Sequence, residues 1–306
     1  MKQRSMRQIT KTKDTLMKNI RFVILITLAA AGFTACEDTI DLQVPNGKTY
    51  PVLDAWITTE GGPQSIRLTQ SVTSYTNNTP APVLSDATIT LQDLTDAKTY
   101  NFAFSNGAYT YDPGGDLSIG KVGHVYKLTV LYKGETFEAT DTIKRVPEID
   151  SITYEFKKAD EAASGEEGYY AYMNAKDIAG GNDYYWIRSY RNDRQHRNTD
   201  VYAINGAFND DVADGWVFIQ PIKEGITDDD KPYQKGEKVI ARIASLSHPS
   251  YYFIQQVIDQ LNSGGLFAKV LENVKPNMVN VTNGGQQKML GWFGASAVSF
   301  KEKDIQ

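Results

Sequence analysis

Cysteine is nearly absent from this sequence, because Cys36 is the only one among 306 residues. A single thiol cannot form an intramolecular disulfide, and it cannot supply the several ligands of a structural zinc site. Histidine is almost as scarce: His124, His196 and His248 lie far apart, and none has an H-x-x-x-H spacing. The sequence therefore predicts no metal site and no disulfide framework, and nothing in it indicates a bound cofactor.

Catalytic motifs are missing as well. There is no G-x-x-x-x-G-K-[ST] phosphate loop, and Gly294-Ala-Ser-Ala lacks the second glycine of a nucleophile elbow. The acidic runs Asn209-Asp210-Asp211 and Asp228-Asp229-Asp230 break the EF-hand spacing, so we interpret them as solvated loops. These absences favour a non-enzymatic protein. A hydrolase stays open as an alternative, because paired carboxylates and Ser-His-Asp triads are assembled in space rather than in sequence.

An apolar run at 22–33 follows a basic stretch and leads into Thr34-Ala35-Cys36. The run is shorter than the roughly 20 residues of a membrane-spanning helix. A basic start, a short apolar segment and small residues before a cysteine are typical of a bacterial lipoprotein signal peptide. We therefore expect removal of residues 1–35, a lipid on Cys36 and a polar tether over 36–49. The alternative is a short membrane anchor or a buried helix.

The mature chain would be strongly acidic. Segment 1–35 carries seven of the 32 basic residues and one of the 37 acids, which leaves 25 basic and 36 acidic side chains and a net charge of −11. An acidic surface disfavours nucleic acid and anionic lipid as partners. Attachment to a membrane would then depend on acyl chains at Cys36, which anchor stably when there is more than one.

The remaining sequence predicts a mainly β fold in two domains. With 18 tyrosines and many short runs of alternating apolar and polar residues, it has the pattern of half-buried strands. Residues 50–146 contain about seven such runs, with hairpin signals at Ser105-Asn106-Gly107 and Lys133-Gly134, which predicts an immunoglobulin-like β-sandwich. Residues 147–306 are predicted to form a second β-rich domain, in which strands pair around Gly180-Gly181-Asn182.

One helix is predicted in the second domain, at about 248–263. Ser247 can cap its start, and Gly264-Gly265 can end it. We expect it to cover an edge or an open end of the second sheet. Its apolar stripe consists of Phe253, Ile254, Val257, Ile258 and Leu261.

Aromatic residues crowd two predicted strands of the second domain. Tyr170, Tyr172, Tyr185 and Trp186 are candidate contacts for a ligand, because side-chain alternation could place the three tyrosines on one face together with Tyr202. Exposed rings would suit a glycan, a peptide or a protein partner. The alternative is that these rings pack in the core.

Several stretches resemble a known family of lipoproteins. They are Cys36-Glu-Asp-Thr-Ile-Asp-Leu, Val52-Leu-Asp-Ala-Trp-Ile-Thr-Thr-Glu-Gly-Gly-Pro, Arg67-Leu-Thr-Gln, Val146-Pro-Glu-Ile-Asp-Ser-Ile and Leu290-Gly-Trp-Phe-Gly-Ala-Ser-Ala-Val. By these patterns the whole mature chain is similar to the domain-of-unknown-function 4249 family of Bacteroidota-type bacteria. The motifs are strand and turn patterns, and none is catalytic. The resemblance carries over no functional residue beyond the lipidated Cys36.

The resemblance also implies a location and a role. It implies an outer-membrane lipoprotein often encoded beside a TonB-dependent receptor, and in such proteins acids like Glu37 and Asp38 accompany export to the extracellular face. We therefore expect an accessory binding or scaffolding subunit of a TonB-dependent uptake system. The alternatives are a glycan or peptide hydrolase with its site in the second domain, and a structural adhesin.

Three short patterns are similar to the O-glycosylation sequon of these bacteria, which is Asp, then Ser or Thr, then an apolar residue. They identify Thr39, Thr142 and Ser151 as candidate glycosylation sites. Chance occurrence in a threonine-rich β-protein is the alternative.

Overall fold

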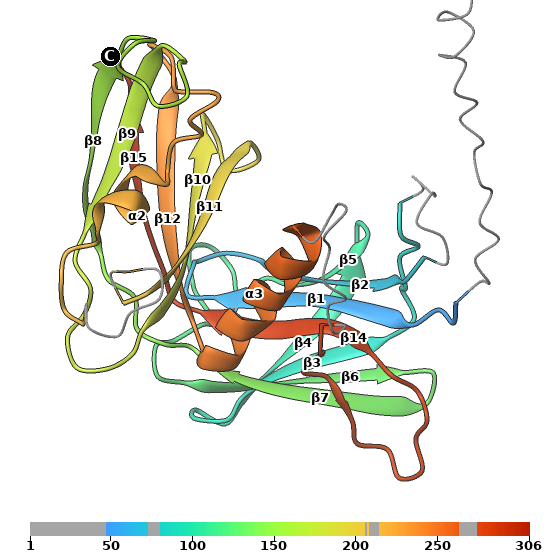
Figure 1. Ribbon diagram of the computed structural model, residues 1–306. Helices are drawn as coiled ribbons and strands as arrows, with labels where there is room; N and C mark the ends of the chain where they lie inside the picture. The colour runs from blue at the N-terminus through green and yellow to red at the C-terminus, as the bar shows by residue number, and fades with distance from the viewer. Residues whose placement is uncertain (1–46, 73–79, 206, 208–213, 263–273) are drawn as a thin grey trace, which may run out of the picture. The chain divides into compact units, whose positions relative to one another are not determined.

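The computed structural model describes residues 47–72, 80–205, 207, 214–262 and 274–306. The predicted signal peptide, Cys36 and Thr39 lie outside these residues, as does the acidic run 209–211. Residues Gly47–Gln306 form one compact unit, and the fold is mainly β, which confirms the predicted class (Figure 1). No helix in the described ranges has both the length and the apolar character needed to cross a membrane.

The first half of the chain forms most of a nine-stranded sheet with the order β13-β7-β6-β3-β4-β5-β2-β1-β14. Both predicted hairpins are present, because Asn106 and Gly107 adopt positive φ between β4 and β5, as do Lys133 and Gly134 between β6 and β7. The strands are β1 (Pro51–Thr58), β2 (Gln64–Gln70), β3 (Thr88–Asp93), β4 (Lys98–Ser105), β5 (Ala108–Tyr111), β6 (Val125–Tyr132), β7 (Glu135–Thr142), β13 (Val279–Asn280) and β14 (Leu290–Ser296).

This sheet curls around one apolar core. Strand β4 pairs with β3 over its first part and with β5 over its last part, so that one continuous sheet supplies both sides of the core. The immunoglobulin-like arrangement is therefore not confirmed. The residues of the nine-stranded sheet that face the core follow the alternation of the strands. They include Leu53, Ala55, Ile57, Ile66, Leu68, Ile89, Leu91, Tyr126, Leu128, Val130, Phe137 and Phe293.

Two strands of this sheet come from the end of the chain. Strand β14 runs parallel to β1, with Leu290 opposite Val52 and Ser296 opposite Thr58, and β13 pairs with β7. The division into two domains at residue 147 stays a prediction, but its second part contributes these two strands to the sheet of the first. A parallel partner cannot be inferred from alternation, because alternation defines the faces of a strand and not its neighbours.

The other strands form a four-stranded sheet of order β11-β10-β12-β15 and a two-stranded sheet of β8 and β9. The predicted pairing of the strands around Gly180-Gly181-Asn182 is wrong, because β9 pairs with β8 whereas β10 pairs with β11 and β12. Both edges of β10 are occupied by β11 and β12, which leaves no edge to which β9 could pair. These strands are β8 (Ile149–Lys157), β9 (Gly168–Ala175), β10 (Tyr184–Arg191), β11 (Arg197–Ile204), β12 (Lys238–Leu246) and β15 (Val298–Asp304).

The predicted helix is confirmed as α3 (His248–Asn262), and a short helix, α2 (Gln220–Glu224), was not predicted. The Ser247 side chain accepts a hydrogen bond from the Ser250 N–H at 3.3 Å, as expected of an N-cap. The apolar stripe of α3 lies against Tyr184, Ile204 and Leu246, which stand together at one end of the four-stranded sheet. It packs with Trp56 of β1 and with Trp186 and Tyr202 of the four-stranded sheet, so α3 bridges the two sheets (Figure 1).

Candidate functional site

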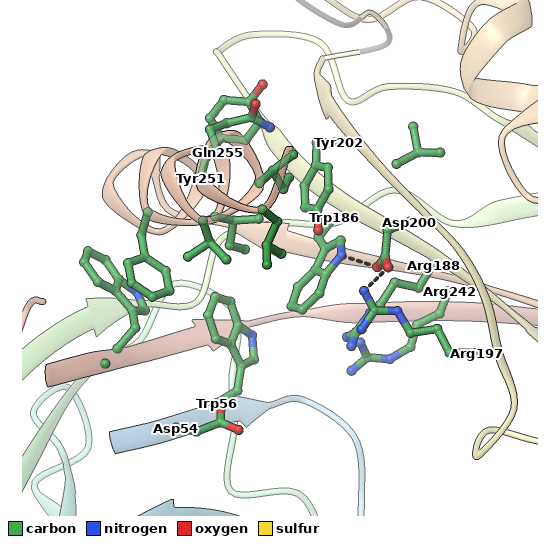
Figure 2. A pocket seen from close by; sticks show the side chains of 18 of the residues that line it. Asp54, Trp56, Trp186, Arg188, Arg197, Asp200, Tyr202, Arg242, Tyr251 and Gln255 are labelled. Atoms are coloured by element: carbon green, nitrogen blue, oxygen red, sulfur yellow. Dashed lines mark hydrogen bonds and ion pairs between the residues drawn. The ribbon is translucent and has the colours of Figure 1, made fainter. Parts of the chain in front are cut away.

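A pocket of about 1380 Å³ opens between α3, the strand pair β1 and β14, and the sheet of β10, β11 and β12 (Figure 2). Its walls are mainly apolar and aromatic, and a few charged side chains converge at one end, which is the usual design of ligand sites. The aromatic lining residues are Trp56, Trp186, Trp292, Tyr202, Tyr251 and Phe253, and the charged ones are Asp54, Arg188, Arg197, Asp200 and Arg242.

The strand register explains why these side chains meet on one face. In β10, Tyr185 and Ile187 point into the core beneath the sheet, so Trp186 and Arg188 point to the opposite face. Trp186 lies opposite Tyr202 of β11. Arg188 lies between Asp200 of β11 and Arg242 of β12. An aromatic pair on β10 and β11 therefore lies beside a charged row that crosses β11, β10 and β12.

The tryptophans form the apolar wall. The rings of Trp56 and Trp186 meet edge to face at 5.7 Å, and Phe253 of α3 stacks on Trp292 of β14 at 4.4 Å. The indole N–H of Trp56 donates to Ser296 Oγ at 2.8 Å. Because the ring nitrogens are occupied in this way, the rings can offer flat apolar surfaces to a ligand.

Three arginines gather at the other end of the pocket (Figure 2). The Arg188 guanidinium lies over the Trp186 ring, 3.8 Å from its centroid. Asp200 accepts from Trp186 Nε1 at 2.7 Å and forms an ion pair with Arg197. Arg242 donates to Glu60 at 2.6 Å, behind the pocket. Of these three cations, Arg188 alone has no ion pair within the described part of the chain.

Burial shapes the electrostatics of this arginine cluster, defined here as Arg188, Arg197 and Arg242. Burial lowers the pKa of Arg188, and the neighbouring charge of Arg242 lowers it further. Burial also raises the pKa of Glu60, but the charges and hydrogen bonds of Arg242 and Arg194 outweigh it, so the Glu60 pKa lies below its usual range. The pocket lining therefore carries three arginines against two carboxylates, and Arg242 is shielded from solvent.

Two nitrogens of the cluster have no hydrogen-bond partner. Among the described residues, Arg188 Nε and Arg242 Nη1 are the only buried side-chain nitrogens or oxygens in this state. Arg242 is only 6% exposed. Buried donors without partners are rare in native proteins, since each costs free energy. Their presence here therefore indicates a functional role for these arginines.

A buried carboxylate holds the start of α3 against β7 and β14. Asp141 Oδ2 accepts from Ser250 Oγ and from the Ala295 N–H, each at 2.9 Å, and Ser250 Oγ in turn accepts from Trp292 Nε1. Burial raises the pKa of Asp141, and the hydrogen bonds from Ser247, Thr142, Ser250 and Ala295 lower it only in part. This network positions Trp292 and α3, which form one side of the pocket.

Asp141→Ala is expected to reduce the free energy of unfolding by about 2 kcal/mol, because the Ala295 N–H would be left buried without an acceptor. The raised pKa adds a pH dependence. A native state that holds the proton more tightly than the unfolded chain loses stability as pH rises above the ordinary value of 3.8. Urea unfolding of the wild type and of Asp141→Ala should therefore show a difference in the free energy of unfolding that becomes smaller between pH 4 and pH 7. Equal stabilities at every pH would contradict the role given to Asp141.

The structure does not bring the predicted aromatic contacts together. Trp186 lines the pocket, as does Tyr202. Tyr185 is fully buried in the core, where its hydroxyl donates to Asp177 at 2.5 Å. Tyr170 is also buried, and its hydroxyl donates to the Glu166 carbonyl at 2.8 Å. These two tyrosines fit the alternative of core packing.

Tyr172 lies on β9, outside the four-stranded sheet, where its hydroxyl contacts Glu155 and its ring lies near Lys157. The shared face predicted for these rings required β9 and β10 to be neighbours, and they are not. Of the candidate glycosylation sites, Thr142 and Ser151 are half-buried, and Ser151 Oγ accepts from Asn174 at 3.2 Å.

Sequence reasoning missed Trp56, Trp292, Arg188 and Arg242. The two tryptophans lie more than 200 residues apart in sequence and meet the sheet only through tertiary packing. A signal did exist for Arg242, because it interrupts an otherwise apolar run in β12, and eight of the nine residues in that strand are buried. Charged residues are almost never fully buried without a partner, so an arginine in such a strand indicates a special site.

The histidines occupy three separate places. His196 pairs with Asp193 on the surface, and His248 begins α3 beside Tyr184. His124 lies with Asp93 and Asp96 in a group that could hold a metal ion, which the sequence spacing did not predict. The possible ligand atoms already have hydrogen-bond or ion-pair partners. His124 Nδ1 lies 2.8 Å from Asp93, Lys121 contacts Asp96, and backbone N–H groups donate to Asp93.

The comparisons with known proteins identify a family. A family model described as a domain of unknown function, DUF4249, matches residues 37–302. Among curated proteins, none matches the chain.

Proposed function

The chain belongs to the DUF4249 family, and we propose that it is a non-enzymatic, lipid-anchored protein of the outer membrane that binds a ligand in the aromatic pocket. In this proposal it faces the extracellular side and serves as an accessory subunit of a TonB-dependent uptake system. The single observation that supports ligand binding most is the pocket between α3 and the two sheets. The lipid anchor and the partner follow from the sequence pattern around Cys36 and from the family resemblance.

Binding suits this pocket better than hydrolysis. Its two carboxylates, Asp54 and Asp200, come from different walls, and Asp200 is held by Arg197 and by the Trp186 N–H. A glycosidase needs two carboxylates that converge on one bond, one of them protonated. The pocket instead combines flat rings with fixed cations, which are groups that hold a ligand rather than transfer protons.

The anchor is tested by Cys36→Ser in a native host. Labelling with radioactive palmitate and membrane fractionation should place the wild type in the membrane fraction with label, and the variant should carry no label, since Cys36 is the attachment site of the acyl chains. Thr39→Ala is a matched control, because it leaves the cysteine intact and should keep both label and location. An unlabelled wild type in the cytosol would overturn the proposed location.

The partner is tested by affinity purification from outer membranes in a strain that expresses both proteins. A TonB-dependent receptor should co-purify with the wild type, and its absence would contradict the accessory role.

Intact mass spectrometry of the same sample tests the sequons, since a mass equal to peptide plus lipid would rule out glycans on Thr39, Thr142 and Ser151.

A further inference from the structure

We propose that the arginine cluster is a subsite for an oxyanion, and that the ligand of the pocket carries this group on a planar or apolar body. Carboxylate, sulfonate, sulfate and phosphate share the required chemistry. The inference rests on the proposed binding function and specifies its ligand class. It is carried by the positions of Arg188 and Arg242 in the sheet and by their unpartnered nitrogens.

Two like charges lie directly opposite each other at this subsite. Arg188 of β10 and Arg242 of β12 are cross-strand partners, a position where like charges destabilise a sheet. Asp200 is the other cross-strand neighbour of Arg188, but it pairs with Arg197 and Trp186 instead. Glu60 binds Arg242 and Arg194. Among the described residues, no carboxylate therefore neutralises Arg188, and a bound anion would do so.

The unpartnered nitrogens have the right chemistry for an oxyanion. A guanidinium presents several N–H donors in a rigid fork that matches the oxygens of a carboxylate or phosphate. Arg188 Nε and Arg242 Nη1 are buried and lack an acceptor within the described chain. These two nitrogens are shielded from solvent as the side chains stand, but both arginines line the pocket, so an oxyanion entering it meets two guanidiniums on neighbouring strands. Sites that violate a local rule without compensation are commonly functional.

The rest of the pocket specifies the body of the ligand. The rings of Trp56 and Trp186 lie between the arginine cluster and α3 (Figure 2). A volume of about 1380 Å³ exceeds the roughly 300–1,000 Å³ of ordinary small-molecule sites, so the ligand can be larger than a single ring. The mature chain used in the test has 25 basic and 36 acidic side chains, a net charge of −11, which disfavours anions elsewhere on the surface. Anion binding should therefore be confined to this subsite.

The test uses two fluorescent probes with the same ring system. Anilinonaphthalene sulfonate carries a sulfonate, and phenylnaphthylamine is its neutral counterpart. Titration of the purified mature protein should show saturable binding of both, with the sulfonate at least about tenfold tighter, which is the effect of about one charge-assisted hydrogen bond. Equal affinities would overturn the oxyanion subsite and leave the pocket-binding function intact. Failure of both probes to bind would count against the proposed binding function itself.

Arg188→Met locates the subsite. It should weaken the sulfonate probe by about tenfold and change the neutral probe by less than about twofold, because it removes the charge and keeps the apolar stem. The variant should melt no lower than the wild type, since an arginine that has no ion pair and faces Arg242 is replaced by an apolar side chain that can still pack on Trp186. A structural role would predict the opposite shift in melting temperature.

Lys98→Met is the control, because Lys98 is exposed on β4, which contributes no residue to the pocket lining, and the substitution removes one charge there. It should leave both affinities unchanged. If Arg188→Met did not fold, Arg188→Gln would replace it, and naphthalene sulfonate should displace the sulfonate probe from the wild type where naphthalene does not. Retained binding of the sulfonate by a folded Arg188 variant would overturn the proposal.

Discussion

Gly291→Ala should lower the free energy of unfolding by at least about 3 kcal/mol, the largest effect expected of any single methyl group in this fold. Gly291 has a φ of 89° at the second position of β14. A Cβ there would lie 1.9 Å from the carbonyl oxygen of Leu53 in β1. That oxygen is backbone and cannot rotate away, so the two strands would have to separate.

The control is Gly107→Ala in the hairpin between β4 and β5. Gly107 has a similar φ of 82°, but an added Cβ would meet nothing within 4 Å. Only the backbone strain would remain, which costs about 1 kcal/mol. Urea denaturation of the three proteins at one pH measures both effects, and similar losses for the two variants would contradict the close approach of β14 to β1. Because β14 carries Trp292, Gly291→Ala should also weaken binding of the neutral probe.

Glu60→Gln is the second large effect, with an expected loss of about 3 kcal/mol, because removing one partner leaves a buried charge uncompensated. Glu60 accepts from Arg242 at 2.6 Å and from Arg194 at 2.7 Å. Without the carboxylate, Arg242 would face Arg188 and would have lost its ion pair. Since the Glu60 side chain is 24% exposed, the loss should lie at the lower end of the range for buried pairs.

The lowered pKa of Glu60 predicts how the destabilisation by Glu60→Gln changes with pH. A carboxylate with a lowered native pKa stabilises the fold at pH values above its ordinary 4.5, and the contribution is lost as pH falls through the native pKa. The difference in the free energy of unfolding between the wild type and Glu60→Gln should therefore become smaller as the pH falls below 4.5. Glu302→Gln is the control, because the Glu302–Lys238 pair is exposed and should contribute less than about 0.5 kcal/mol. A loss as small as that of the control would show that the Arg242 charge is solvated.

The local elements of this protein could be predicted because their signals are local. Side-chain alternation marks β1 to β7, turn residues with positive φ mark the hairpins at Asn106-Gly107 and Lys133-Gly134, and a stripe of apolar residues after Ser247 marks α3. Each signal depends on atoms within a few residues of one another. The lipid attachment at Cys36 is likewise a local inference from the residues before it, and it stays a prediction.

The partners of these elements follow from contacts between distant parts of the chain. Alternation places Trp186 and Arg188 on one face of β10, but it does not reveal that Arg242 becomes the neighbour of Arg188, or that β14 returns to lie beside β1. A strand pairs with whichever edge best buries both of its faces, and that choice depends on the whole core. The pocket, with its tryptophans from β1, β10 and β14 and its crowded arginines, exists only after that choice has been made.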